Sequence, residues 1–158
     1  MTLRLSFITA VCLALAAPAT ANDLADQAFA LINQHRAAAG CEPLAHNAKL
    51  AFAARGHAQA MAQGDFFSHN SKNGAKYTSR IKAEGYKGRR TAENIAAGQS
   101  SAAEVVAVWM ASAGHAKNIR NCALKDSGIG MAYQKDDQPL PGQKHPMRYY
   151  WVQVFGTP

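Results

Sequence analysis

Apolar residues recur at helical spacing in the first part of the chain, and capping or breaking residues bound each segment. The first segment runs over residues 24–35, and Gly40 marks its end. Asn47 has the residue type that caps a helix N-terminus, and an apolar face follows it as far as Gly64. The pattern therefore predicts two helices joined by a short connection.

Two further helices are expected downstream. A short one is predicted over residues 79–84, with Thr78 as its cap. The next begins with Ser101-Ala102-Ala103-Glu104, where serine and glutamate three positions apart match a capping box. Its apolar stripe comprises Val105, Val106, Trp109, Met110 and Ala113.

The hydrophobic period changes after Cys122 and becomes typical of strands. Residues 127–134 and 148–155 are rich in Ile, Val, Tyr and Trp, and the second run is apolar on both of its faces. The proline-containing segment 135–147 is expected to be the loop that joins them as an antiparallel pair. Helices on both sides of such a sheet predict an α/β protein with three α/β/α layers and a mainly antiparallel central sheet.

The first 21 residues have the layout of a secretory signal peptide. Arg4 precedes an apolar run over residues 5–17, and Ala19-Thr20-Ala21 is a cleavage signal with small residues. The run is shorter than the ~20 residues of a membrane-spanning helix, although an uncleaved N-terminal anchor remains an alternative. We expect a single domain over residues 22–158, with no further transmembrane segment, in a secreted or periplasmic protein.

The formal net charge of +7 raises the question of anionic partners. The charges are scattered, and Lys87-Gly88-Arg89-Arg90 is the one tight cluster. This pattern disfavours a dedicated nucleic-acid-binding protein. A mild attraction to anionic surfaces, such as cell-envelope polymers, follows from the same charge.

Two cysteines, Cys41 and Cys122, lie outside the expected leader. An even number in an exported chain predicts a disulfide, and here only one intramolecular pairing is available. Two free thiols or an intermolecular bridge are the alternatives. The bridge would close a loop of roughly 80 residues and contribute about 4 kcal/mol in the chain-entropy model.

An ordered set of short motifs spans nearly the whole chain after the leader, and the set resembles the bacterial branch of the CAP superfamily. That superfamily also includes cysteine-rich secretory proteins, venom allergens and pathogenesis-related proteins. The motifs, in chain order, are Leu31-Ile32-Asn33-x-x-Arg36, His57-Ala58-x-x-Met61-Ala62, Phe67-Ser68-His69, Ala92-Glu93-Asn94-Ile95-Ala96, Gly114-His115-x-x-Asn118-Ile119 and Tyr150-Trp151-Val152-Gln153-Val154-Phe155-Gly156.

The resemblance implies an α/β/α sandwich and a cleft with a tetrad of two histidines and two acidic residues. His69, Glu93 and His115 match three members of that tetrad. Ser112 stands where the second acidic residue is expected, three positions after Trp109. The chain therefore resembles a shorter form, and a mechanism that needs both carboxylates is in doubt.

A divalent metal, above all zinc, is one candidate for such a cleft. Two imidazoles and a carboxylate (His69, His115 and Glu93) with one open position make a reasonable zinc ligand set. The sequence contains no His-x-x-x-His or His-Glu-x-x-His pattern, so spacing gives no independent support. A hydrogen-bonded His–Glu–His cluster that holds loops together is the alternative.

Nucleophilic hydrolysis is a second possibility. Ser68 adjoins His69, and Glu93 could orient the imidazole of a Ser–His–Glu arrangement. The sequence has no Gly-x-Ser-x-Gly elbow, and Ser68 equally suits the capping of the turn that carries His69.

Binding without turnover is the third possibility and the one we expect. The resemblance implies a lipid, a sterol or a glycan as ligand for some relatives, and the sequence itself selects none of them. A metal-assisted hydrolase of peptide or envelope substrates, using His69, Glu93 and His115, is the alternative function.

Overall fold

The computed structural model describes residues 19–158. The expected leader, residues 1–21, lies almost entirely outside the described residues, and its cleavage stays a prediction. Among the residues that are described, no helix is both long and apolar enough to cross a bilayer.

A sheet of four strands forms the centre of the molecule, in the order β1-β3-β4-β2. The predicted strands correspond to β3 (Asp126–Tyr133) and β4 (Tyr149–Thr157), which are antiparallel as expected. β2 (Arg90–Ala97) pairs with β4 along its whole length, and the two-residue β1 (Ala45–His46) joins β3 in parallel. The sheet is thus mixed, with one parallel pair.

β2 was not predicted as a strand. Its first residues, Arg90 and Thr91, are partly or fully exposed, and polar Glu93 and Asn94 interrupt the apolar run that follows. Such a segment has no clear period-two pattern. Its pairing with β4 makes it extended, and pairing partners are not visible in local sequence.

Five helices are described, and their ends test the predicted caps. The helices are α1 (Ala21–Ala38), α2 (Ala48–Gln63), α3 (Tyr77–Ala83), α4 (Ala102–Ala111) and α5 (Ala113–Ile119). Asn47 caps α2, and Ser101 with Glu104 forms the predicted capping box of α4. Thr78 is not the cap of α3, because that helix starts one residue earlier and Lys76 precedes it. The predicted fourth helix ends at Ala111, and the chain turns at Ser112 into α5.

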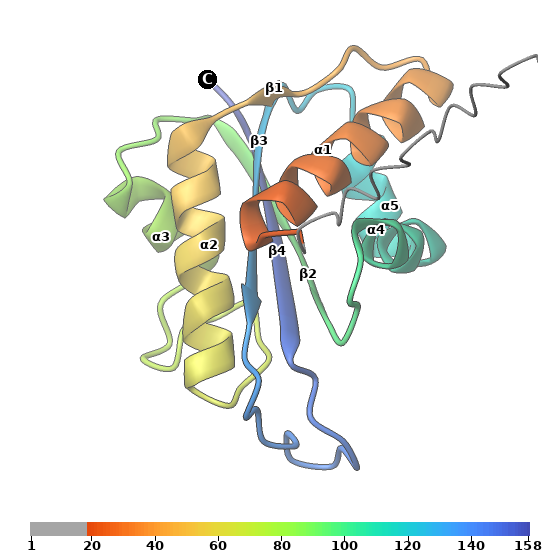
Figure 1. The fold of residues 1–158 in the computed structure, drawn as a ribbon. Coiled ribbons are helices and arrows are strands. Elements are labelled where there is room, and N and C mark those ends of the chain that lie inside the picture. The colour runs from red at the N-terminus through yellow and green to blue at the C-terminus, as the bar shows by residue number, and fades with distance from the viewer. Residues whose placement is uncertain (1–18) are drawn as a thin grey trace, which may run out of the picture.

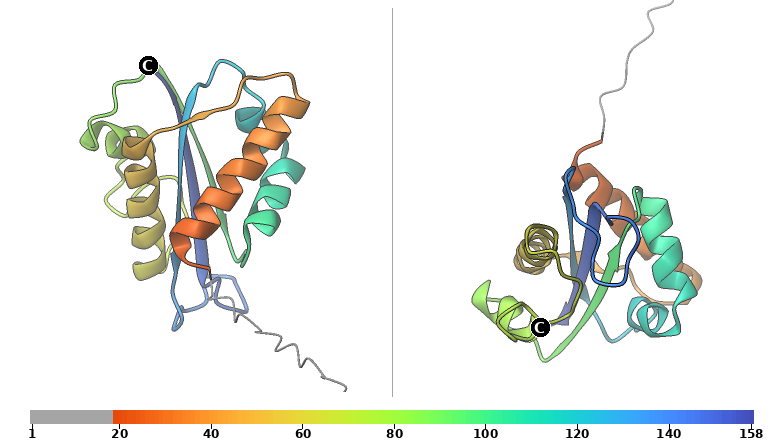
Figure 2. Two further views of the ribbon diagram at one scale, coloured as in Figure 1. Left: turned by 45° about the horizontal axis from the view of Figure 1, so that its top comes forward. Right: turned by 90° about the horizontal axis from the view of Figure 1, so that it is seen from below.

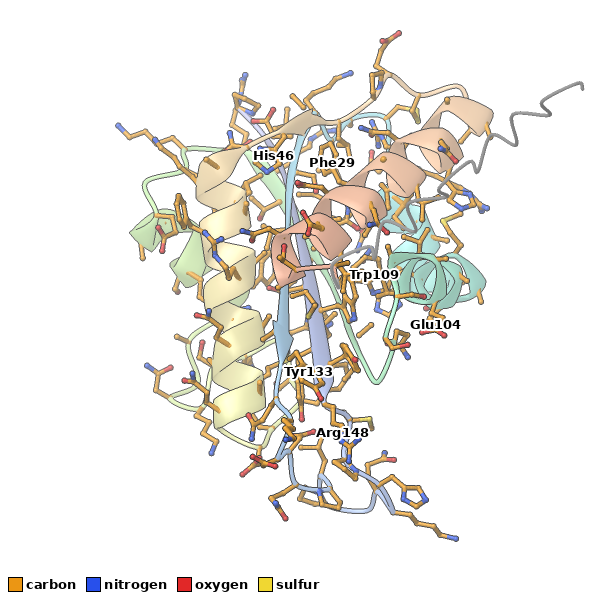
Figure 3. The ribbon with its side chains drawn as sticks, viewed as in Figure 1. Phe29, His46, Glu104, Trp109, Tyr133 and Arg148 are labelled. Atoms are coloured by element: carbon orange, nitrogen blue, oxygen red, sulfur yellow. A yellow bond between two sulfur atoms is a disulfide. The ribbon has the colours of Figure 1, made fainter. Side chains whose placement is uncertain are left out.

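The helices lie on both faces of the sheet, which confirms the three-layer arrangement (Figures 1 and 2). α2 and α3 cover one face, where Tyr150, Val152 and Val154 of β4 point. α1 and α4 cover the other, where Trp151 and Phe155 pack with the buried Trp109. The side chain of Trp109 lies between α4 and the sheet (Figure 3). Strand β4 is therefore apolar on both faces because both are covered.

α2 packs directly on β3 at two glycines. A side chain at Gly128 or Gly130 would overlap the α2 backbone at Ala51 and Arg55 respectively. Only residues without a Cβ permit this approach of helix and strand. At the end of the molecule where α2 begins, Phe29 of α1 contacts His46 of β1 edge to face, with ring centroids 5.7 Å apart (Figure 3).

A buried arginine and a disulfide connect α1 to the segment that follows α5. Cys41 and Cys122 form the predicted bridge, with Cα atoms 5.0 Å apart. Arg36 is fully buried and donates to four carbonyl oxygens, those of Glu42 at 3.1 Å, Ile119 at 2.8 Å, Asn121 at 3.0 Å and Leu124 at 3.0 Å. These two features hold the end of α5 against α1 and thereby fix the helix that carries His115.

Candidate functional site

His69 lies in the connection between α2 and α3, and His57 of α2 anchors that connection. The Nε2–H of His57 donates to the carbonyl oxygen of Ser68 at 2.7 Å. The imidazole of His57 is 1% exposed, and its Nδ1 has no partner within the described residues. Burial is the main cause that lowers its pKa below the ordinary histidine value, so the ring is held neutral. His57 is thus an interior histidine with one hydrogen bond, through which it positions the residue next to His69.

Ser68 serves the turn rather than a nucleophilic site. Its hydroxyl oxygen accepts from the backbone N–H of Asn70 at 3.1 Å, and its carbonyl accepts from His57. In the described part of the chain, no hydrogen bond joins the Ser68 hydroxyl to His69. The geometry therefore gives no support to a Ser68–His69–Glu93 relay.

Glu93 is the centre of the site, and both of its carboxylate oxygens are engaged. His69 Nδ1–H donates to Oε1 at 2.9 Å, and Arg80 Nη2 donates to Oε2 at 2.7 Å. The side chain of Glu93 is 1% exposed, whereas that of His69 is 51% exposed. Because the carboxylate accepts from Nδ1, the proton of a neutral His69 ring resides there. The Nε2 atom of that ring is then an acceptor on its exposed side.

Arg80 is the functional residue that sequence reasoning missed. It comes from α3, and its guanidinium also donates to the carbonyl of His69 at 3.0 Å and to the Ser71 hydroxyl at 3.1 Å. A buried carboxylate needs a cationic partner, so Glu93 itself was a signal that an arginine or lysine lies nearby. The sequence spacing between Arg80 and Glu93 did not show which arginine or lysine is that partner.

His115 approaches the same edge strand from α5. Asn94, which follows Glu93 on β2, donates from Nδ2 to the His115 carbonyl at 3.3 Å and accepts from Asn118 Nδ2 at 2.9 Å. Burial lowers the pKa of His115, and the nearby positive charge of His69 lowers it further. The direct contact between His115 and β2 is the hydrogen bond that its carbonyl accepts from Asn94. Asn94 thus bonds to the backbone of α5, and Asn118 bonds to the Asn94 side chain.

The three residues matched by the family motifs therefore come from three elements that meet at the free edge of β2. Ser112, the fourth, occupies the turn between α4 and α5. Within residues 19–158, its hydroxyl makes no hydrogen bond to His69, Glu93 or His115. We use the term histidine cluster for His69, Arg80, Glu93 and His115.

The donor set of the histidine cluster does not fit a three-ligand metal site in this arrangement. The described residues contain no group of three or more His, Cys, Asp or Glu side chains placed to hold a metal ion. Each oxygen of Glu93 accepts one hydrogen bond, from His69 or from Arg80. Metal binding by His69, His115 and Glu93 together stays a prediction from sequence.

Comparison with known proteins places the chain within a family. A model of the CAP family, described as the cysteine-rich secretory protein family, matches residues 29–155. YkwD, an uncharacterized protein of Bacillus subtilis, is 33% identical over 114 residues, which is 72% of this chain and 44% of YkwD. The chain thus spans less than half of that relative's length.

Solved structures share the fold at low sequence identity. One is an extracellular protein of Bacillus anthracis that contains an SCP domain, with a TM-score of 0.72 and 24% identity, over 90% of this chain and 45% of that one. Another is an outer surface protein of Borrelia burgdorferi, with a TM-score of 0.69 and 20% identity, over 82% of this chain and 88% of that one. At these identities the likeness concerns the fold.

Proposed function

The chain belongs to the CAP, or cysteine-rich secretory protein, family, and we propose that it is an exported protein that binds a ligand at the histidine cluster. Its location outside the cytoplasm is supported by the Cys41–Cys122 disulfide, since such bridges persist in oxidising compartments. The extracellular and outer-surface descriptions of its structural relatives agree with that location.

One observation carries the proposal of binding: the Glu93 carboxylate is fully engaged with His69 and Arg80. A general base must be free to take a proton, and a metal ligand must offer a lone pair to the ion. Glu93 instead neutralises Arg80 and orients the His69 ring. The result is an imidazole whose exposed edge has a defined hydrogen-bonding role.

The hydrolase alternative has weaker support from the same geometry. It needs an activating base, and because both Glu93 oxygens already accept hydrogen bonds, the exposed Nε2 of His69 is the candidate for that role. Ser68 is occupied in its turn, and both described cysteines form the disulfide. Because neither Ser68 nor a described cysteine is placed as a nucleophile beside His69, recognition has more support than covalent hydrolysis.

Of the three ligand classes expected from sequence, an envelope glycan has the most support. His69 is half exposed and offers an acceptor nitrogen, which suits the hydroxyl groups of a sugar. Of the large apolar side chains that are exposed in the described part of the chain, Phe67 alone lies near His69 in the sequence, and Phe52, Val108 and Tyr133 belong to α2, α4 and β3. A lipid or a sterol would require such apolar surface near the polar groups.

The experiment follows the histidine ring resonances by nuclear magnetic resonance while soluble peptidoglycan fragments are added. We expect the resonances of His69 and His115 to shift, and the double variant His69→Gln/His115→Gln to abolish binding. The matched control is His35→Gln/His145→Gln, which changes two exposed histidines outside the cluster and should bind normally. If the fragments bind and the His69 and His115 resonances stay unmoved, the proposal is wrong. Failure of every fragment to bind would contradict it equally.

A further inference from the structure

A second surface of the molecule, formed by residues outside the histidine cluster, carries several basic side chains around the segment that joins α3 to β2. Three depressions follow one another along it, with volumes of about 520, 400 and 260 Å³. The first two share Tyr86 and Lys87, and the last two share Arg89. Shared lining makes them one continuous groove, which we name the basic groove.

Five cations line the basic groove, and no carboxylate does. They are Lys49, Lys82, Lys87, Arg89 and Arg90, and all five are exposed. Among residues 19–158, none of them forms an ion pair with a carboxylate side chain, whereas Arg80 of the same region does. Uncompensated positive charge in a concave surface raises the local concentration of anions.

The groove is held in shape by an aromatic ring under the basic loop. Tyr86 is buried, and its hydroxyl donates to Asp126 Oδ2 at 2.9 Å. A side chain at Gly88 or Gly156 would overlap the Tyr86 ring, so the chain closes over that ring because both positions lack a Cβ. Lys87 and Arg89 then flank Gly88. Lys49 is held from the other side, where its Nζ donates to the Gly85 carbonyl at 3.1 Å.

We propose that the basic groove binds a linear polymer that carries repeated phosphate groups. Adjoining depressions that have Lys87 and then Arg89 in common match a chain with several negative charges better than a single anion. Lysine and arginine both serve as phosphate ligands, and Thr78 and Thr91 in the middle depression add hydroxyl groups.

Two other polyanions fit this surface less well. A bilayer presents a broad surface to which apolar side chains anchor, and none of the exposed large apolar residues of the described chain lines the groove. Single-stranded nucleic acid binds with its bases stacked on aromatic rings. Tyr86, the aromatic residue of the groove, is buried and hydrogen bonded.

The test is a titration of the chain with inorganic polyphosphate, with orthophosphate at equal phosphate concentration for comparison. We expect binding by polyphosphate alone, and about tenfold weakening for each doubling of salt if all five cations contribute. Lys87→Gln/Arg89→Gln should weaken binding roughly tenfold and reduce the salt dependence, because two counterion-releasing contacts are lost. The matched control Lys135→Gln/Lys144→Gln removes the same charge from the loop before β4 and should retain both affinity and salt dependence.

Several outcomes would overturn the proposal. Equal loss in both double variants would mean that only net charge matters. Equal occupancy by orthophosphate would mean an anion pocket rather than a polymer groove. Phosphatidylglycerol vesicles or a thymidine oligomer that outcompete polyphosphate would assign the groove to a membrane or to nucleic acid. Thermal unfolding of each variant without ligand verifies that folding is unchanged.

Discussion

Arg36 and Glu93 are both buried charges in this molecule, yet their partners differ in kind. Arg36 is 0% exposed and donates only to backbone carbonyls, four in number. Glu93 is 6% exposed and bonds to two side chains, of which Arg80 is a cation and His69 can become one. The first group is surrounded by backbone dipoles, whereas the second is paired with a permanent cation and with an imidazole.

This difference in partners distinguishes Arg36, which supports the fold, from Glu93, which belongs to the candidate site. Carbonyl dipoles and the disulfide beside Arg36 respond neither to pH nor to a ligand, so that region acts as a fixed support. His69, by contrast, contacts the buried Glu93 carboxylate, and 51% of its side chain is exposed to solvent. A buried charge that is hydrogen bonded to a solvent-exposed side chain therefore indicates a functional site better than the burial of a charge alone does.

The largest expected effect comes from Arg36→Met. The substitution leaves four carbonyl groups without their donor, and we expect a loss of about 4 kcal/mol in the free energy of unfolding. Urea denaturation measures it, and Arg120→Met, an exposed arginine near the same segment, is the control. A cost below about 1 kcal/mol would mean that water replaces the guanidinium and that the region is not a rigid support.

Arg80→Met should cost somewhat less, about 3 kcal/mol, because it leaves Glu93 buried without its cation. The partly exposed Arg80 can be replaced by water more readily than Arg36. Lys82→Met on the same helix is the matched control and should stay within about 0.5 kcal/mol. An unchanged stability at neutral pH would show that Glu93 needs no cation.

The pH dependence of folding should reveal the buried histidines. The pKa of His57 is lowered in the folded state, so the unfolded chain takes up its proton first as the pH falls. The stabilisation is complete above about pH 6.5 and is lost progressively as the pH falls below that value. His115 contributes in the same direction.

His57→Gln tests this assignment, because its amide can still donate to the Ser68 carbonyl but does not titrate. Denaturation of that variant at several pH values should show a flatter acid limb, whereas exposed His145→Gln should follow the parent curve. A His57→Gln curve that parallels the parent would assign the acid limb to other groups.

The smallest expected effect on stability is at Ser112, which lies outside the histidine cluster. The Ser112 side chain makes no capping hydrogen bond to α5, so Ser112→Ala should cost less than about 0.5 kcal/mol. Ser101→Ala removes the capping box of α4 and should cost about 1 kcal/mol. Thermal unfolding compares the two. A larger loss for Ser112→Ala would give that residue a structural role.

Local pattern predicted much of this structure, and its failures share a cause. Asn47 and the Ser101–Glu104 box act through bonds within a few residues, so the sequence reveals them. β2 depends on pairing with β4, and Arg80 gains its role from a carboxylate on that strand. Both are long-range contacts that local pattern does not contain.

Family motifs identified His69, Glu93 and His115 as candidates, but they did not say what each side chain contacts. The sequence left open whether they bind a divalent metal or form a hydrogen-bonded cluster. The structure shows a carboxylate that is committed to an arginine and an imidazole. These hydrogen-bond partners of Glu93 follow from the packing of three elements at one edge of the sheet, which the motifs do not describe.

The most direct test is a two-bond proton–nitrogen spectrum of the imidazole rings at about pH 7.5, above the ordinary histidine pKa. We expect His69 to carry its proton on Nδ1, where Glu93 accepts it, and Glu93→Gln to release this preference. His57 should show the opposite tautomer, protonated on Nε2 toward Ser68. A His69 ring protonated on Nε2 in the unmodified chain would contradict the role of Glu93 as the group that orients His69.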